Sequence, residues 1–260
     1  MPVEISAVDM AIFSLPLDRY FPDQLEASEI RRARDSVMVE CLRRFGFSMA
    51  LPEWSSPPVG GKNERRYLLA SLSRAREFGY KWPEISQHRS PSGPVMAPQI
   101  QAVLSGAGSS VVAGERVPEG GCHGEADRRL KINEAPGSDL DFLRRLDARA
   151  YTAMKGDARI LAAIVGWSAC MKKAGFDYPD PGRANDDPAF NTIVASVDEI
   201  ATAVADVSCK EQVGLVPLMA AIEVAFQNRE IEGAKERLGD IMDRKREQIG
   251  LAREILRNLR

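Results

Sequence analysis

The sequence has few of the residues on which enzyme chemistry most often depends. It contains two histidines, His88 and His123, and four cysteines among 260 residues. Neither His-Glu-x-x-His nor Cys-x-x-Cys, two common spacings of zinc ligands, occurs in it. A Gly-x-Gly-x-x-Gly turn after a strand and a complete phosphate-binding loop are also missing. The sequence therefore predicts no bound metal and no cofactor.

The sequence also lacks a large excess of charge and long apolar runs. Lys plus Arg number 35 and Asp plus Glu number 37, which gives a net charge of −2. This balance argues against a nucleic-acid binder that relies on positive charge. No run of about 18 uncharged apolar residues occurs, so we expect no transmembrane span. The first apolar stretch, residues 10–17, follows no basic residue, so we expect either a cytosolic protein or an exported one whose signal this chain lacks.

Helical patterns cover most of the chain, and no clear strand alternation appears. Capping residues and glycines mark the ends of several expected helices. The expected helices cover residues 23–45, 71–78, 98–105, 122–132, 139–154, 157–174, 196–213 and 217–259. In the helix at 196–213, Ser196 and Glu199 form the pattern of a capping box. The predicted fold class is mainly α, with no substantial sheet.

We expect this helical chain to form two diverged halves behind an irregular N-terminal segment, residues 1–22. The first half covers residues 23–135 and contains a long loop rich in Ser, Gly and Pro at 86–121. The second half covers residues 136–260 and ends in a long amphipathic helix at about 217–259. We favour packing of this segment on the core of its own chain, as one helix or as two helices broken at a glycine. The alternative is association with a second copy as a coiled coil.

The strongest pattern is an internal repeat. The heptapeptide Cys41–Phe47 matches Cys170–Phe176, because each has Cys, a long apolar residue, two bases, a variable residue and Gly-Phe. A proline follows eleven residues after each cysteine, at Pro52 and Pro181. The two bases suit the negative end of a helix dipole, and the glycine permits the positive φ that ends a helix.

Each copy of the repeat is followed by one further cysteine, at Cys122 or Cys209. The repeat favours the pairs Cys41–Cys122 and Cys170–Cys209, with one disulfide in each half. The alternative is that all four cysteines are reduced, buried thiols. Disulfides would imply an oxidising compartment.

Several further motifs resemble those of a group of uncharacterised exported or lipoprotein-like proteins of actinobacteria. The motifs, together with the helix that ends in residues 41–46, are Leu15–Tyr20, Asn63–Tyr67, Phe78–Tyr80, Gly120–Ala126, Trp167–Met171 and Ala205–Cys209. The resemblance extends from about residue 15 to residue 235. It implies a secreted or envelope-attached location and two disulfides, and it implies no activity. The chain departs from the group because it lacks the signal peptide and the lipid-attachment cysteine.

Other local patterns have weaker functional interpretations. Cys122 and His123 are adjacent and suggest a nucleophile with its base, although neighbouring side chains usually point apart. The acidic stretch at residues 177–188 offers oxygen ligands for Ca²⁺, but a solvated loop is the simpler interpretation. We interpret five arginine pairs as solvated helix faces. They are Arg31-Arg32, Arg43-Arg44, Arg65-Arg66, Arg128-Arg129 and Arg144-Arg145.

The sequence therefore favours a non-catalytic, disulfide-stabilised binding or interaction protein located outside the cytoplasm. No catalytic residue is assigned, and the partner is unknown, with cell-wall polymer or another protein as candidates and nucleic acid not expected. Two alternatives remain: an extracytoplasmic hydrolase with an unrecognised site, and a cytosolic helical adaptor with free thiols.

Overall fold

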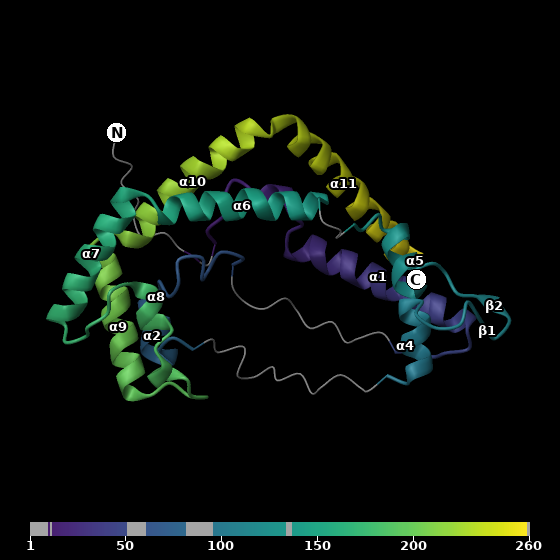
Figure 1. Cartoon of the computed structure of the whole chain (residues 1–260), viewed down its shortest axis with the longest axis horizontal. Coiled ribbons are helices and arrows are strands. Elements are labelled where there is room, and N and C mark those ends of the chain that lie inside the picture. Colours follow the sequence, from purple (N-terminus) through teal and green to yellow (C-terminus); the bar gives the residue numbers. More distant parts are fainter. Residues whose placement is uncertain (1–9, 11, 51–60, 82–95, 134–136, 259–260) are drawn as a thin grey trace. The chain divides into compact units, whose positions relative to one another are not determined.

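The computed structural model describes residues 10, 12–50, 61–81, 96–133 and 137–258. Over these residues the regular structure is almost entirely helical (Figure 1). The exception is a short antiparallel pair, β1 (Val111–Val112) and β2 (Glu115–Arg116), in which Val112 lies opposite Glu115. The prediction of a mainly α fold without a substantial sheet is confirmed.

The chain forms two compact units, and each unit is assembled from segments that are distant in sequence. Unit 1 consists of three segments, Met1–Pro16, Pro58–Arg89 and Leu146–Gly233. Unit 2 consists of the other three segments, Leu17–Pro57, Ser90–Arg145 and Ala234–Arg260. This division differs from the sequential halves 23–135 and 136–260, since each unit takes chain from both sides of residue 135.

Unit 1 is centred on α9, which packs against α2, α7, α8 and α10. The elements of unit 1 are α2 (Leu72–Phe78), α7 (Ala158–Lys173), α8 (Pro181–Asn185), the 3₁₀ helix η2 (Pro188–Phe190), α9 (Val197–Gln212), α10 (Leu215–Gly233) and most of α6 (Asp139–Lys155). Trp167, Met171 and Val207 are completely buried in one apolar cluster of unit 1. Met154 and Ile160 are completely buried in another.

Unit 2 is centred on α1, which packs against α4, α5 and α11. Its elements are the 3₁₀ helix η1 (Asp18–Tyr20), α1 (Gln24–Arg44), α4 (Pro98–Ser105), β1, β2, α5 (Gly121–Arg129), the start of α6 and α11 (Lys235–Arg257). The C-terminal helical segment is thus two helices, because α10 ends at Gly233 and α11 begins at Lys235. Leu238, Ile249 and Ala252 of α11 are buried, so its apolar face is already covered within unit 2.

Local capping follows the sequence closely. Asp23 caps α1 in a reciprocal box with Glu26, and Ser71 caps α2 by accepting from the Arg74 amide. Ser196 caps α9 as expected, but the reciprocal half of its predicted box is wrong. The carboxylate of Glu199 is instead buried and accepts from the Tyr80 amide at 3.0 Å.

Two predicted loops contain short regular elements. The acidic stretch at 177–188 holds α8 and the start of η2, and Asp180 and Asp187 cap these two elements. These two carboxylates therefore accept hydrogen bonds from backbone amides. Within the predicted loop 86–121, residues 96–121 contain α4 and the β1–β2 pair, and residues 82–95 lie outside the described residues.

Candidate ligand-binding site

Both predicted disulfides are formed. Cys41 is bonded to Cys122 in unit 2, and Cys170 is bonded to Cys209 in unit 1, each with a Cα–Cα distance of 5.7 Å. No cysteine of the chain is free. The pairing inferred from the repeat is confirmed, and Cys122 cannot act as a nucleophile beside His123 because its sulfur is already bonded.

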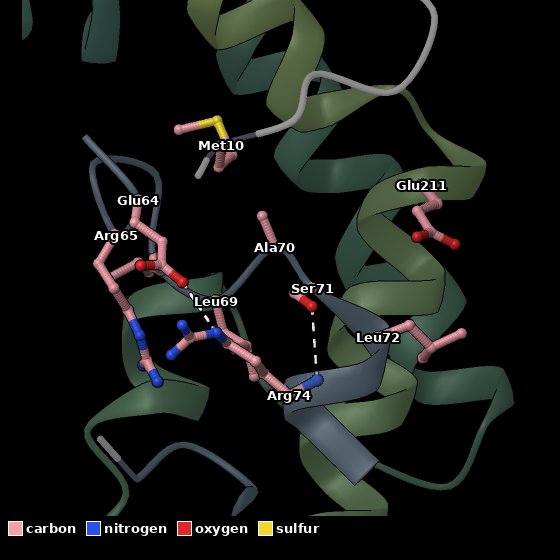
Figure 2. Close-up of a pocket in the computed structure, with 10 residues that line it drawn as sticks. Met10, Glu64, Arg65, Leu69, Ala70, Ser71, Leu72, Arg74 and Glu211 are labelled. Carbon is pink, nitrogen blue, oxygen red and sulfur yellow. Dashed lines mark hydrogen bonds and ion pairs between the residues drawn. The ribbon is translucent and has the colours of Figure 1, made fainter. Parts of the chain in front are cut away.

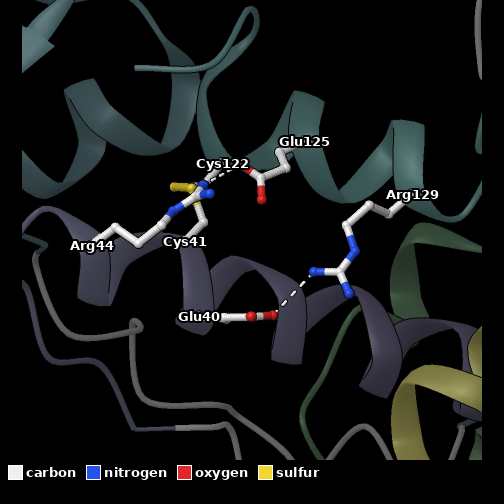
Figure 3. The surroundings of a disulfide bond; sticks show 6 residues. All are labelled: Glu40, Cys41, Arg44, Cys122, Glu125 and Arg129. Carbon is white, nitrogen blue, oxygen red and sulfur yellow. Dashed lines mark hydrogen bonds and ion pairs between the residues drawn. A yellow bond between two sulfur atoms is a disulfide. The ribbon is translucent and has the colours of Figure 1, made fainter. Parts of the chain in front are cut away.

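The Cys41–Cys122 disulfide joins α1 to α5 in the core of unit 2 (Figure 3). Both cysteines are fully buried. Two ion pairs join the same two helices near the disulfide, from Arg44 to Glu125 and from Arg129 to Glu40. These pairs are largely exposed, and such pairs contribute little stability. The disulfide and the apolar core therefore hold the two helices together.

The two copies of the repeat end their helices with the same backbone geometry. Gly46 and Gly175 have φ values of 78° and 94°, in the left-handed region. The amides of Phe47 and Phe176 then donate to the carbonyl five residues earlier, at 3.1 and 2.9 Å. This is the hydrogen-bond pattern of a Schellman motif. In each copy it turns the backbone away from the helix next to a disulfide.

A pocket of about 330 Å³ lies in unit 1 (Figure 2). Most of its lining comes from one irregular segment, residues 63–71, and from the start of α2. Met10 contributes an apolar wall, and Glu211 of α9 contributes a carboxylate. The volume is at the lower end of the range for small-molecule sites.

Partly buried hydrogen bonds of two side chains hold the first part of segment 63–71 in place. Asn63 donates to the Phe13 carbonyl at 3.2 Å. Arg65 donates to the carbonyls of Tyr80 and Lys81 at 3.1 and 2.9 Å. The segment has no helical or strand hydrogen-bond ladder of its own, so these side chains determine its path.

Arg66 and Tyr67 connect the segment to α6 and α10. The guanidinium of Arg66 donates to both oxygens of Asp147, at 2.9 and 2.8 Å, and also pairs with the fully buried Glu223. The hydroxyl of Tyr67 donates to Glu223 at 2.9 Å. Burial, and then the adjacent Glu223 charge, raises the pKa of Tyr67. Two carboxylates facing one guanidinium raise the pKa of Arg66 despite its burial.

A second network of buried hydrogen bonds lies on α9 and reaches the segment that lines the pocket. The ammonium of Lys210 donates to the Leu69 carbonyl at 2.9 Å and to Asp206 at 2.8 Å. The indole of Trp167 donates to the other oxygen of Asp206 at 3.0 Å. Burial lowers the pKa of Lys210 and raises the pKa of Asp206, while their mutual attraction opposes both shifts. This ion pair therefore holds Leu69, a residue that lines the pocket.

Glu199 secures the chain that follows α2. Its carboxylate accepts from the Tyr80 amide and pairs with Lys81 at 3.2 Å. Gly79 ends α2 with a φ of 59°, and a Cβ at this position would lie 3.0 Å from Glu199. The close approach requires glycine, and it allows the Glu199 carboxylate to reach the backbone.

The pocket itself contains one incompletely paired carboxylate. Glu64 is 8% exposed, and one of its oxygens pairs with the Arg74 Nε at 2.8 Å. Its other oxygen is buried and has no hydrogen-bond partner among the described residues. Leu68, which also lines the pocket, has a φ of 64°. A positive φ is strained for a leucine, and such strain is concentrated at functional sites.

Sequence reasoning missed most of this site. The interpretation of Arg65-Arg66 as a solvated helix face is wrong, because both side chains are partly buried on an irregular segment. The other four arginine pairs are exposed on helices, as expected. His123 belongs to unit 2 and is not among the pocket residues. One signal was present in the sequence. Asp206 and Lys210 lie on the face of α9 at which helical periodicity predicts apolar residues.

Among the residues that the structure describes, no three Asp, Glu, His or Cys residues are grouped so that they can hold a metal ion. None of the helices described there is both long enough and apolar enough to pass through a lipid bilayer. In comparisons with known proteins, no family model, no curated protein and no solved structure matches this chain.

Proposed function

We propose that this chain is a non-catalytic binding protein that works outside the cytoplasm, either secreted or attached to the cell envelope. The observation that carries the proposal is the closure of all four cysteines into two disulfides, each within one unit. Disulfides persist in oxidising compartments, whereas cytosolic thiols are kept reduced. The motifs that resemble exported actinobacterial proteins agree with this location.

The pocket of unit 1 is the proposed binding site. Hydrogen bonds of Arg66, Tyr67 and Lys210 join its lining segment to α6, α10 and α9. A lining fixed before the ligand arrives lowers the entropic cost of binding. The apolar face of α11, which the sequence offered as a surface for self-association, is buried within unit 2. The pocket is therefore the better candidate for recognition.

The proposal is tested by trapping the thiols in intact cells that produce the chain from its natural gene. Cells are lysed in N-ethylmaleimide and fractionated, and the protein is weighed before and after denaturing reduction. We expect no adduct before reduction, four adducts after it, and protein in the extracytoplasmic fraction. The variant C41A/C122A provides the matched control, for which two adducts are expected after reduction.

The opposite result has a clear meaning. Four adducts on first trapping, with the protein in the cytoplasmic fraction, would replace the proposal with a cytosolic helical adaptor that carries free thiols.

A further inference from the structure

One wall of the pocket carries a hydrogen-bond acceptor that the described residues leave unused. The Glu64 side chain is more than nine-tenths buried, and its Oε1 is engaged by Arg74. Its Oε2 is buried without a hydrogen-bond partner in the described part of the chain. A buried carboxylate oxygen is unfavourable until a donor reaches it, and a positively charged donor is the strongest type. This oxygen therefore selects a ligand with an N–H donor.

The same wall carries two positive charges against one negative charge. Figure 2 shows the guanidinium groups of Arg65 and Arg74 on the same side of the pocket as the Glu64 carboxylate. Burial, and then the charge of Arg74, lowers the pKa of Arg65, so the two positive charges act unfavourably on each other. An anionic group bound beside them relieves this repulsion, and a carboxylate matches guanidinium geometry.

The rest of the lining is apolar. Met10, Leu68 and Leu72 contribute aliphatic surface, and Ala70 lies between Met10 and Leu72 in Figure 2. The volume of about 330 Å³ accommodates a small molecule with a branched aliphatic side chain. Glu211 on the opposite wall brings the total charge of the pocket to zero. A neutral total charge disfavours ligands with a net charge of either sign.

We propose that the pocket binds a small zwitterion whose ammonium and carboxylate groups are adjacent and whose side chain is apolar, namely a free α-amino acid of the leucine type. The ammonium donates to Glu64 Oε2, and the carboxylate lies beside the guanidinium of Arg74. Arg65, whose terminal nitrogens donate to the Tyr80 and Lys81 carbonyls, contributes its positive charge. The aliphatic side chain contacts Met10 and Leu68. This inference rests on the proposed function, because it names the ligand class of the same site.

The experiment measures binding of four probes to the full-length oxidised protein by isothermal titration calorimetry. L-Leucine carries both charges, L-leucinamide has only the ammonium, N-acetyl-L-leucine has only the carboxylate, and glycine lacks the apolar side chain. We expect L-leucine to bind about tenfold or more tightly than each of the other three, because each lacks one charge-assisted hydrogen bond or the apolar contact.

Two variants locate the site. Glu64→Gln removes the charge that faces the ammonium and is expected to weaken L-leucine binding by about tenfold. The matched control is Glu77→Gln. It changes an exposed carboxylate on α2 that does not line the pocket, so it should leave binding unchanged. Ala70→Phe fills the pocket without altering any charge and should abolish binding, so the site remains testable if the Glu64 variant does not fold.

Three outcomes would overturn the inference. Equal affinity for N-acetyl-L-leucine and L-leucine would indicate an anion site, and equal affinity for L-leucinamide would indicate a cation site. Absence of L-leucine binding at 10 mM, a test concentration about 10-fold above weak millimolar affinities, would show that the pocket takes another ligand class. None of these results changes the thiol trapping or the location of the protein, so the proposed function is judged separately.

Discussion

Three charged side chains near the pocket of unit 1 are buried, whereas the ion pairs between α1 and α5 in unit 2 lie on the surface. Asp206, Lys210 and Glu223 are at most 2% exposed. In unit 2, the paired side chains of Arg129 and Glu40 are 44% and 65% exposed. Burying charge is costly unless each group is paired and hydrogen-bonded. Unit 1 bears this cost where it fixes the pocket segment, and unit 2 relies on an apolar core.

The disulfides provide the largest test of this comparison. Their sequence separations are 81 residues for Cys41–Cys122 and 39 residues for Cys170–Cys209. In the chain-entropy model, the variant C41A/C122A loses about 4.5 kcal/mol and C170A/C209A about 3.9 kcal/mol of unfolding free energy. Urea denaturation followed by hydrogen exchange in each unit measures both losses. A larger loss for C170A/C209A would contradict loop length as the cause.

Removing one partner of the buried ion pair tests unit 1 alone. Lys210→Met leaves Asp206 charged and buried, and we expect a loss of about 3 to 5 kcal/mol. The double variant D206L/K210M removes both charges and should recover most of that stability. Urea denaturation measures all variants, with Lys172→Met on the exposed face of α7 as the matched control. Equal unfolding free energies of Lys210→Met and Lys172→Met would show that the Asp206–Lys210 ion pair does not stabilise unit 1.

A steric change tests unit 2 alone. A Cβ on Gly121 would lie 2.4 Å from the carbonyl oxygens of Val103 and Leu104 at the end of α4. We therefore expect Gly121→Ala to cost about 1 to 3 kcal/mol through forced backbone movement. Gly239 lies in the exposed part of α11 with no atom near its Cβ position, so Gly239→Ala should instead stabilise by about 0.5 to 1 kcal/mol. Thermal unfolding measures whether Gly121→Ala lowers and Gly239→Ala raises the midpoint temperature.

The smallest expected difference between the two units lies in how their stability depends on pH. In unit 1, burial raises the pKa of Tyr67 and Tyr80 above the ordinary value of 10.0. Above pH 10 the unfolded chain loses these protons while the folded chain retains them, so unit 1 loses stability as the pH rises. The slope is at most about 1.4 kcal/mol per pH unit for each tyrosine.

Unit 2 should respond to acid instead. Burial, and then the charge of Arg34, lowers the pKa of His123 below 6.5. As the pH falls below 6.5, the unfolded chain gains a proton that the folded chain resists, so unit 2 loses stability. Hydrogen exchange at pH 5, 7 and 10.5 measures both responses. His123→Gln should remove the acid response of unit 2, and an unchanged response would assign it to other groups.

The same contrast explains what the sequence can predict. Helix ends at Asp23, Ser71 and Gly46 are predicted within one or two residues, because caps and left-handed glycines depend on local chemistry. The disulfide pairing also follows from the sequence, since the repeat makes Cys41 and Cys170 equivalent and each is followed by one further cysteine.

The pocket could not be predicted in the same way. Its charged residues are ordinary in sequence, and their burial depends on segments more than a hundred residues away, as for Arg66 with Glu223. The Ser196 box shows the same limit, because Glu199 exchanges a local partner for the distant Tyr80 amide. Long-range polar pairing depends on three-dimensional packing, which spacing in a single sequence does not record.

The packing of α1 against α11 has a consequence for biosynthesis. The ribosome makes α1 before most other elements and α11 after all of them. A nascent chain that has reached Gly233 contains every segment of unit 1, while unit 2 still lacks the helix that covers Ala33 and its neighbours. Unit 2 is therefore completed last, and until then α1 presents apolar surface to which chaperones can bind.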